Sequence, residues 1–258
     1  MEEKQFYTAE RRMAILSELR LMRKVSVNEL SEKFSVSTAT VRSDLADLEA
    51  QGLLKRTHGG AIPVYGTSFE LTSTEKERMH KNEKLVIAAY AAKCVEDGDT
   101  IAVDSGSTMR FFAEMLSEKK KLTVVTYDMR IAGVFDAFDG AKVILAGGVL
   151  RKGFYSCVGE FTTDILKKLN VDKAFIATNA IGKNGKLSTP DPLQAEVKKS
   201  MLETGTQKYL LADGSKFGAT SLVNFADVKD FDCIITDCSA PDYAIKDIKE
   251  SGTEIITA

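Results

Sequence analysis

A short run of small polar residues, Asp-Ser-Gly-Ser-Thr, follows an apolar segment that ends at residue 103. A serine nucleophile would need a neighbouring base and an orienting acid, and no such pair is recognisable in the sequence. The run could instead bind an anion, because the free amides of a helix's first turn point at what precedes the helix, and hydroxyls add further donors. A plain turn whose hydroxyls cap the helix is the other alternative. The residues concerned are Asp104, Ser105, Gly106, Ser107 and Thr108.

Similar polar residues follow other short apolar segments. Arg151 comes shortly after a glycine pair and could clamp a phosphate, although a solvated surface charge would look the same. Asn179 could donate to a hydroxyl group, whereas the Asp104 carboxylate would repel a phosphate and is better suited to sugar hydroxyls or to bracing the loop amides. Together these positions predict an anion site built from several strand ends. The further candidates are Gly147, Gly148, Arg151, Asn179, Glu196, Asp213 and Lys216.

The elements that must position these residues alternate between short apolar runs and helix-like stretches. Such alternation is typical of an α/β domain with a mainly parallel sheet, in which ligands bind at the carboxyl ends of the strands. The predicted strands are 100–104, 122–126, 142–146, 173–178, 208–213, 233–237 and 254–257. The predicted helices are 109–117, 129–138, 162–169, 195–203 and 243–250.

The first 65 residues have a different, helical periodicity. Helix, short helix, tight turn, helix and hairpin form the order of a winged helix-turn-helix, whose third helix enters the major groove of DNA. That helix is predicted to begin at Ser37 and to end near Gly52. Short polar side chains at its start allow a close approach to base edges, and Arg42 can pair with guanine or a phosphate. The candidate DNA-binding residues are Ser37, Thr38, Thr40, Arg42, Ser43, Lys55, Arg56 and His58.

The two regions together resemble the DeoR family of bacterial transcriptional regulators. The resemblance rests on residues 25–31, 36–45 and 48–61 in the first region and on DSGST, LAGG, the EVKK helix and ADGSKFG in the second. It implies operator binding, a Rossmann-like sensor domain similar to ribose-5-phosphate isomerase and CoA-transferase folds, and a phosphorylated sugar or related compound as effector. Many members have two consecutive arginines where this chain has Arg42-Ser43, so a phosphate contact or the choice of operator is expected to differ.

Composition sets limits on these interpretations. The chain has 258 residues, 44% of them hydrophobic, and a formal net charge of −2, so a DNA-binding surface must be local. We expect residues 1–65 to form the DNA-binding domain, 66–81 a linker, and 82–258 an α/β effector-binding and oligomerisation domain. The four cysteines lack the spacing of a metal site, no cofactor is expected, and no signal peptide or membrane span is apparent. We therefore expect a cytoplasmic protein.

The resulting prediction is a regulator, expected to be a repressor, of a carbohydrate-use operon, controlled by a phosphorylated sugar or sugar alcohol. A homodimer or homotetramer is expected, because paired half-sites suit symmetric proteins. One alternative is a sugar-phosphate isomerase-like enzyme with a regulatory DNA-binding head, although fold kinship does not transfer activity. Another is a protein-interaction adaptor that uses the winged helix.

Overall fold

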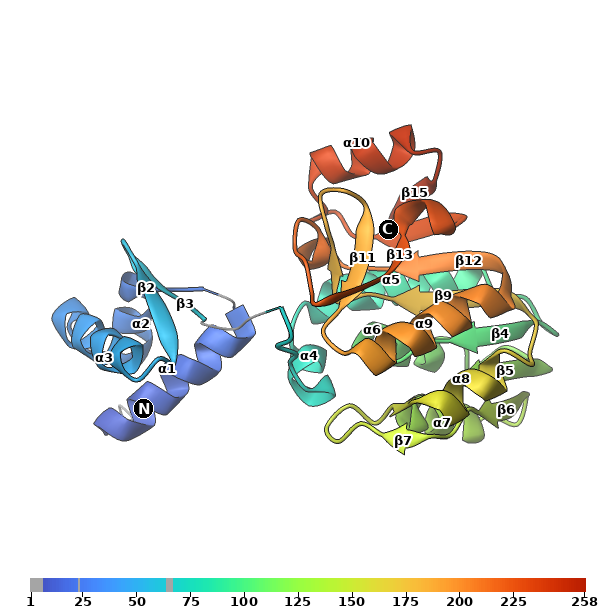
Figure 1. Cartoon of the computed structure of the whole chain (residues 1–258), viewed down its shortest axis with the longest axis horizontal. Coiled ribbons are helices and arrows are strands. Elements are labelled where there is room, and N and C mark those ends of the chain that lie inside the picture. The colour runs from blue at the N-terminus through green and yellow to red at the C-terminus, as the bar shows by residue number, and fades with distance from the viewer. Residues whose placement is uncertain (1–6, 23, 64–66) are drawn as a thin grey trace. The chain divides into compact units, whose positions relative to one another are not determined.

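The computed structural model describes residues 7–22, 24–63 and 67–258 (Figure 1). Contacts group the chain into two compact units, Met1–Gly66 and Thr67–Ala258. None of the helices in the described ranges is long and apolar enough to cross a bilayer.

The first unit is a winged helix. Its helices are α1 (Thr8–Met22), α2 (Val27–Phe34) and α3 (Thr38–Ala50), and its strands are β1 (Val25–Ser26), β2 (Leu54–Thr57) and β3 (Gly60–Pro63). The strands form an antiparallel sheet in the order β1-β3-β2. Gly60 has to be glycine here, since a Cβ would lie 1.8 Å from the Val25 carbonyl oxygen. The wing therefore closes tightly onto β1.

Helix α3 is held by apolar packing and by a buried carboxylate. Val41, Leu45 and Leu48 face the core of the unit. Asp44, only 2% exposed, accepts hydrogen bonds from Arg11 at 2.6 Å and from Arg12 at 2.9 Å, which tie α3 to α1. Because the buried charge is paired with arginines, it fixes the orientation of α3 and leaves the opposite face of that helix to solvent.

The second unit is built on a parallel sheet in the order β15-β14-β12-β9-β4-β5-β6. All seven of its strands were predicted from the sequence, with ends that shift by up to three residues. Their bounds are β4 (Thr100–Val103), β5 (Leu122–Thr126), β6 (Ala141–Leu145), β9 (Val171–Ala177), β12 (Gly205–Leu211), β14 (Cys233–Thr236) and β15 (Glu254–Thr257).

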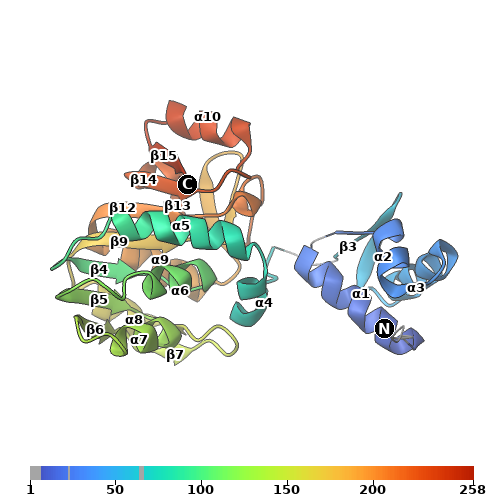
Figure 2. The ribbon, with the colours of Figure 1, turned by 180° about the vertical axis from the view of Figure 1, so that it is seen from behind.

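Helices cover both faces of the sheet, as Figures 1 and 2 show from opposite sides. One face packs against α5 (Lys81–Lys93), α6 (Ser107–Glu114) and α7 (Met129–Asp136). The other packs against α8 (Glu160–Leu166), α9 (Pro192–Thr204) and α10 (Asp242–Glu250). Both faces of central strands such as β4, β5 and β14 are therefore buried, which explains why these strands read as continuous apolar runs.

Smaller elements complete the unit. A hairpin is formed by β7 (Val149–Leu150) and β8 (Cys157–Val158), and a small sheet by β10 (Ala180–Ile181), β11 (Lys186–Thr189) and β13 (Val223–Asp227). Two 3₁₀ turns complete the unit. The first, η1 (Gly214–Lys216), follows β12, and the second, η2 (Val228–Asp230), lies between β13 and β14. The sequence did not predict either small sheet.

Residues 66–81, expected to be a linker that could be partly helical, are structured from Thr67 onward. The structure has a helix there, α4 (Ser73–Arg78), and Thr67 and its successors belong to the second unit. The Thr72 hydroxyl and the Glu75 carboxylate cap the helix reciprocally, which the polar composition concealed. Ser73 donates from its amide to the Gly153 carbonyl and from its hydroxyl to the Phe154 carbonyl, both at 3.1 Å. This stretch is therefore part of the α/β unit.

Candidate functional site

The chain reverses its direction of travel across the sheet between β4 and β9. From β4 it proceeds to β5 and β6 at one edge, and then returns beside β4 as β9 to build the other half. In open α/β sheets ligands bind at the carboxyl ends of the strands beside such a point, and we refer to this region of the sheet as the β4–β9 crevice. Asp104 follows β4 and Thr178 follows β9, so the predicted strand ends do meet at this crevice.

Asp104 lies at the bottom of the crevice and is fully engaged by the protein. Its Oδ1 accepts from the Ser105 amide at 2.8 Å and from the Tyr127 hydroxyl. Its Oδ2 accepts from the Ala177 amide at 2.8 Å and from Lys198 Nζ at 2.5 Å. With every lone pair directed at a protein donor, Asp104 braces the β4 and β9 ends and is not free for a ligand.

The loop after Asp104 leads into α6 without a side-chain cap. Gly106 is the residue before the helix, with φ of 108°, a backbone conformation that suits glycine. A Cβ at Gly106 would have no atom within 4 Å, so the space beside the residue is open. The hydroxyls of Ser107 and Thr108 are not used as caps. The structure thus disagrees with the plain capped turn, and the first-turn amides are left for another acceptor.

Asp128, at the start of α7, flanks the same loop. Its Oδ1 caps α7 by accepting from the Arg130 amide at 2.9 Å, while Oδ2 lies 3.4 Å from the Gly106 amide. Burial raises the pKa of Asp128 to about 6, although the backbone donors oppose the shift. Near neutral pH the charge beside the loop is therefore sensitive to pH.

Arg151 enters the crevice from the β7–β8 hairpin and is 8% exposed. Its Nη2 donates to Glu70 at 2.7 Å and its Nε to Asp191 at 3.2 Å, while the guanidinium lies 4.2 Å from the centre of the Phe154 ring. Among the residues that the structure describes, the buried Nη1 has no hydrogen-bond partner. A buried donor without a partner is costly, and it marks a place for an acceptor that the chain itself does not supply.

A line of hydrogen bonds joins Arg151 to the bottom of the crevice. Asn179 donates to Glu70 at 3.0 Å, and its Oδ1 accepts from the Thr189 hydroxyl, also at 3.0 Å. That hydroxyl lies 2.7 Å from Gln194 Oε1, and Gln194 in turn donates to Ser105 at 3.3 Å. The predicted residues Ser105, Asn179 and Arg151 thus belong to one polar network.

Lysines gather on the remaining side of the crevice. Lys84 is buried and donates to the carbonyls of Lys76 and Met79 at 2.5 Å each. Burial, reinforced by the charge of Lys216, lowers the pKa of Lys84 to about 8. Lys216 lies 3.5 Å from Asp213 Oδ2, an oxygen that accepts no hydrogen bond within the described part of the chain. Burial alone would raise the pKa of Asp213, but Lys216 and Ser215 outweigh it and lower the value.

Three predicted residues have other roles. Glu196 is exposed on α9, because Gln194 and Lys198, two positions to either side, are the residues that face the crevice. Gly148 permits close packing, since a Cβ there would lie 2.2 Å from the Thr162 hydroxyl, and Gly147 offers its carbonyl to that same hydroxyl. Glu196 and the glycine pair are therefore not part of the donor set.

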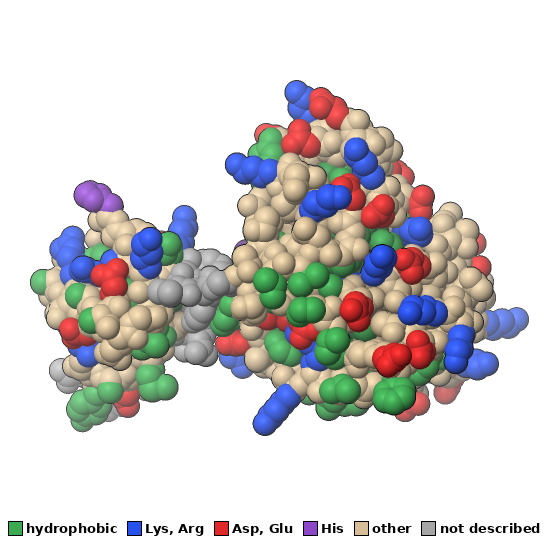
Figure 3. Space-filling view, in the orientation of Figure 1, with side chains coloured by type: hydrophobic (Ala, Val, Ile, Leu, Met, Phe, Trp, Pro, Cys, Tyr) green, Lys and Arg blue, Asp and Glu red, His purple; other side chains and the backbone are tan. Residues whose placement is uncertain are grey.

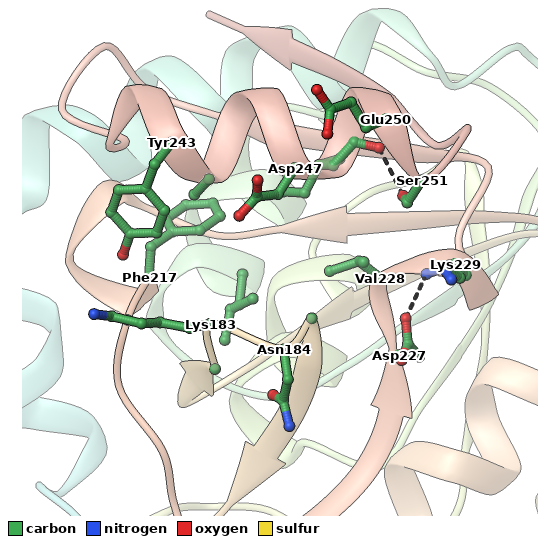
Figure 4. Close-up of a pocket in the computed structure, with 16 residues that line it drawn as sticks. Lys183, Asn184, Phe217, Asp227, Val228, Lys229, Tyr243, Asp247, Glu250 and Ser251 are labelled. Carbon is green, nitrogen blue, oxygen red and sulfur yellow. Dashed lines mark hydrogen bonds between the residues drawn. The ribbon is translucent and has the colours of Figure 1, made fainter.

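A separate hollow of about 380 Å³ lies between the β10–β11 hairpin, the end of η1 and α10 (Figure 4). Phe217 and Tyr243 lie on one side of it, with Lys183, Asp227 and Asp247 around the opening. None of the predicted effector-site residues lines this hollow. We place the candidate anion site at the strand ends, because the buried donor without a partner is found there.

The predicted DNA-binding residues share the solvent-facing side of α3 and the wing. Ser37, Arg42 and Ser43 are exposed, as are Lys55, Arg56 and His58 of the wing, and Figure 3 shows Lys and Arg side chains on the visible face of this unit. Thr38 and Thr40 are half-buried. The Ser37 hydroxyl caps α3 by accepting from the Thr40 amide at 3.1 Å. Arg56 donates to Glu49 from both its amide and its Nε, so part of its guanidinium already has a partner.

Comparison with known proteins agrees with this arrangement. The model of the DeoR-like helix-turn-helix domain matches residues 11–64, and that of the DeoR C terminal sensor domain matches residues 79–238. The chain belongs to the DeoR family of transcriptional regulators. Within this family it is 33% identical to the HTH-type transcriptional regulator GlpR of Haloferax volcanii over 231 residues, which cover 90% of each chain.

Two further relatives of the DeoR family are from Escherichia coli. The chain is 30% identical to the putative aga operon transcriptional repressor of strain O157:H7, over 96% of this chain and 93% of that one. It is 31% identical to the glycerol-3-phosphate regulon repressor of strain K12, over 84% and 86% respectively. These relatives are named as regulators and not as enzymes, so the isomerase alternative is not favoured. Similarity to ribose 5-phosphate isomerase A of Methanocaldococcus jannaschii is limited to a TM-score of 0.39 and 17% identity, over 53% of this chain and 54% of that one.

Several residues of the crevice were missed by sequence reasoning. Tyr127 and Asp128 follow β5 directly, and the same strand-end rule that selected Asp104 could have found them. Lys198 and Gln194 lie on a helix that is buried on several sides, so periodicity gave no single inward face. Glu70 carries no sequence signal, because it lies in a polar stretch outside any apolar run.

Proposed function

We propose that this DeoR-family regulator is a repressor of a carbohydrate-use operon and that a phosphorylated sugar or sugar alcohol, bound at the β4–β9 crevice, controls it. The observation that carries the effector assignment is Arg151, whose buried Nη1 lacks a partner within the described residues and whose carboxylate partner Glu70 also pairs with Lys76. The aga operon and glycerol-3-phosphate regulon repressors among its relatives support the same class of effector by their names.

The phosphate group is assigned to the cationic side of the crevice. Arg151, Lys84 and Lys216 supply positive charge, and the uncapped start of α6 supplies amide donors and the positive end of a helix dipole. Polar side chains such as Asn179 would then bind the hydroxyls of the sugar. Asp104 positions the loop, and its engaged oxygens leave it no direct contact with the ligand.

The operator is assigned to the exposed side of α3 and the wing. Small side chains at the start of α3 permit close approach to the major groove, and Arg42 extends beyond them. Lys55 and His58 on the wing would contact the DNA backbone or the minor groove. We propose a homodimer or homotetramer acting in the cytoplasm, because two winged helices on paired half-sites multiply the affinity of one.

Control requires that the effector prefer the arrangement that does not bind the operator. A decrease in operator affinity of about 100-fold corresponds to about 2.7 kcal/mol of coupling between the two sites. Charge-assisted hydrogen bonds from one arginine, two lysines and helix amides to a phosphate are of sufficient strength to supply that difference.

Thermal unfolding of the purified protein against a panel of phosphorylated sugars and sugar alcohols, each beside its unphosphorylated parent, tests the proposal. A compound present at 100 times its dissociation constant adds about 2.7 kcal/mol of stability. We expect stabilisation by a phosphorylated compound and not by its parent. Stabilisation by parents alone, or by neither group, would contradict a phosphate site in the crevice and leave the DNA-binding unit unaffected.

A further inference from the structure

Glu70 occupies the place where the proposed effector would put its anionic group. It is the fourth residue of the second unit, and its side chain is 5% exposed. Its Oε2 accepts from Arg151 Nη2 at 2.7 Å, and its Oε1 accepts from Lys76 Nζ at 2.5 Å and from Asn179 at 3.0 Å. A carboxylate surrounded by an arginine, a lysine and an amide donor has the environment that a bound phosphate would require.

The positive charges around Glu70 lower the pKa of its carboxyl group. Burial alone would raise its pKa, but Lys76 and Arg151 outweigh that effect and lower the pKa to about 2. The carboxylate is therefore ionised at every physiological pH, and it satisfies a guanidinium that is largely removed from solvent. Without an anion at this point, Arg151 would keep two buried nitrogens unpaired instead of one.

The segment that carries Glu70 is attached to the sheet mainly by polar contacts. We refer to residues 67–80 as the strap. Beyond Glu70, it is held by Ser73, which bonds the backbone of the 153–154 loop, and by Glu77, which pairs with Arg110 at 2.6 Å and with Arg130. Leu71 is buried, and Phe69 and Met79 are half-buried. An anion that rests on buried cations can be exchanged for another anion on the same cations, whereas an apolar core element has no such substitute.

We propose that Glu70 is an internal counter-anion that holds the strap against the effector site, and that the phosphate of the effector displaces it and releases the strap. This rests on the proposed function and adds its regulation. The exchange replaces a single negative charge by the larger charge of a phosphate on the same Arg151 and Lys76 donors. Since the strap directly follows the winged-helix unit in the sequence, its release is a signal that occupancy of the crevice can send along the chain.

The experiment uses the full chain, with inorganic phosphate as the probe. Three proteins are compared: wild type, Glu70→Gln, and Glu118→Gln, which removes an equal charge from an exposed position after α6. Removing the competing carboxylate should increase phosphate affinity, and we expect at least a tenfold lower Kd for Glu70→Gln, measured by calorimetry, with no change for Glu118→Gln.

Hydrogen exchange of the strap amides gives the second readout. In wild type, saturating phosphate should accelerate exchange in residues 67–80, whereas in Glu70→Gln exchange should be fast already and phosphate should change it little. Slower exchange in the wild-type strap on phosphate binding would overturn the proposal, because the strap would then close on the ligand.

The calorimetry separates this inference from the effector site itself. Equal phosphate affinity in wild type and Glu70→Gln, lost in both on Arg151→Ala, would refute the competition and retain the anion site. Weaker binding by Glu70→Gln would make Glu70 part of the ligand-binding set and refute the counter-anion. If Glu70→Gln, with its donors freed, binds no phosphate at all, both this inference and the proposed effector site are wrong.

Discussion

Lys198 and Asp104 form an ion pair of 2.5 Å at the bottom of the crevice, and their side chains are only 2% and 0% exposed. Lys198 comes from α9 and Asp104 from the end of β4, so the pair joins a helix on one face of the sheet to the centre of the sheet itself. Lys198 also donates to the Ala177 carbonyl at 3.0 Å, which adds the end of β9. The pair fixes the relative position of the elements that build the site.

Replacing Lys198 by methionine should be strongly destabilising. The substitution keeps the aliphatic volume but leaves the buried Asp104 carboxylate without its cation, and breaking a buried pair in this way typically costs about 3–5 kcal/mol. Urea unfolding of the full chain measures the loss. Lys199→Met, at the next position but exposed, should stay within about 0.5 kcal/mol of wild type. Equal effects at the two positions would show that the pair is not what stabilises this region.

Replacing Arg151 by alanine should abolish most of the response to a phosphorylated effector. A charge-assisted contact to a desolvated guanidinium contributes about 2–3 kcal/mol, so phosphate affinity should fall about 30- to 150-fold. Lys152→Ala removes a neighbouring but exposed charge and should leave the affinity unchanged. Calorimetric titration compares the two variants, and comparable losses would point to general surface charge instead of a site.

Replacing Arg42 by alanine should weaken operator binding without unfolding the winged helix. Arg42 is exposed, and its intramolecular contact, to the Thr38 hydroxyl at 3.4 Å, is long. We expect a loss of about 1–3 kcal/mol if it pairs with a base, or a decrease of about 1 in the salt slope if it binds a phosphate. Titration of operator DNA at several salt concentrations distinguishes the two. Lys33→Ala on α2, where Lys33 pairs with Glu18, is the control, and its operator affinity should not change.

The stability of the protein should respond to pH through Asp128. Its pKa is about 6 in the folded protein, above the ordinary value of 3.8, so the folded state binds the proton more tightly than the unfolded state does. Stability from this group is present below about pH 4 and is lost as pH rises to about 6. Asp128→Asn keeps a helix-capping side chain and removes the charge. Relative to wild type, it should gain about 2 kcal/mol between pH 4 and pH 7.5 in urea unfolding; parallel profiles would contradict the shift.

The fold could largely be predicted from the sequence, and the reasons are physical. Strands such as β5 and β14 are buried on both faces and therefore stand out as apolar runs with turns between them. The short strands β10 and β11 have no such contrast, because each is only a few residues long and borders polar turns. The start of α6 was placed near residue 109 instead of Ser107, because the hydroxyl-rich loop was expected to lie before the helix and not in its first turn.

The candidate site was predicted less completely. The strand-end rule selected Asp104, Ser105, Asn179 and Arg151, and the structure joins them in one network. It could not select Glu70, whose partner Arg151 is distant in the sequence. Nor could it identify which side of α9 faces inward, since that depends on how the helix packs between the sheet and α8. Long-range pairing of charges leaves no trace in local composition.

The strap also sets the length of the tether between the two units. While Glu70 holds it, residues 67–80 are part of the α/β unit and add nothing to the reach of the winged helix. Once released, they would extend that reach by as much as about 45 Å. The effective concentration of a second winged helix at its half-site falls steeply as a flexible tether lengthens. In the proposed homodimer or homotetramer, a single carboxylate would thus determine whether two tethered heads bind an operator as one bivalent unit or as two independent weak ligands.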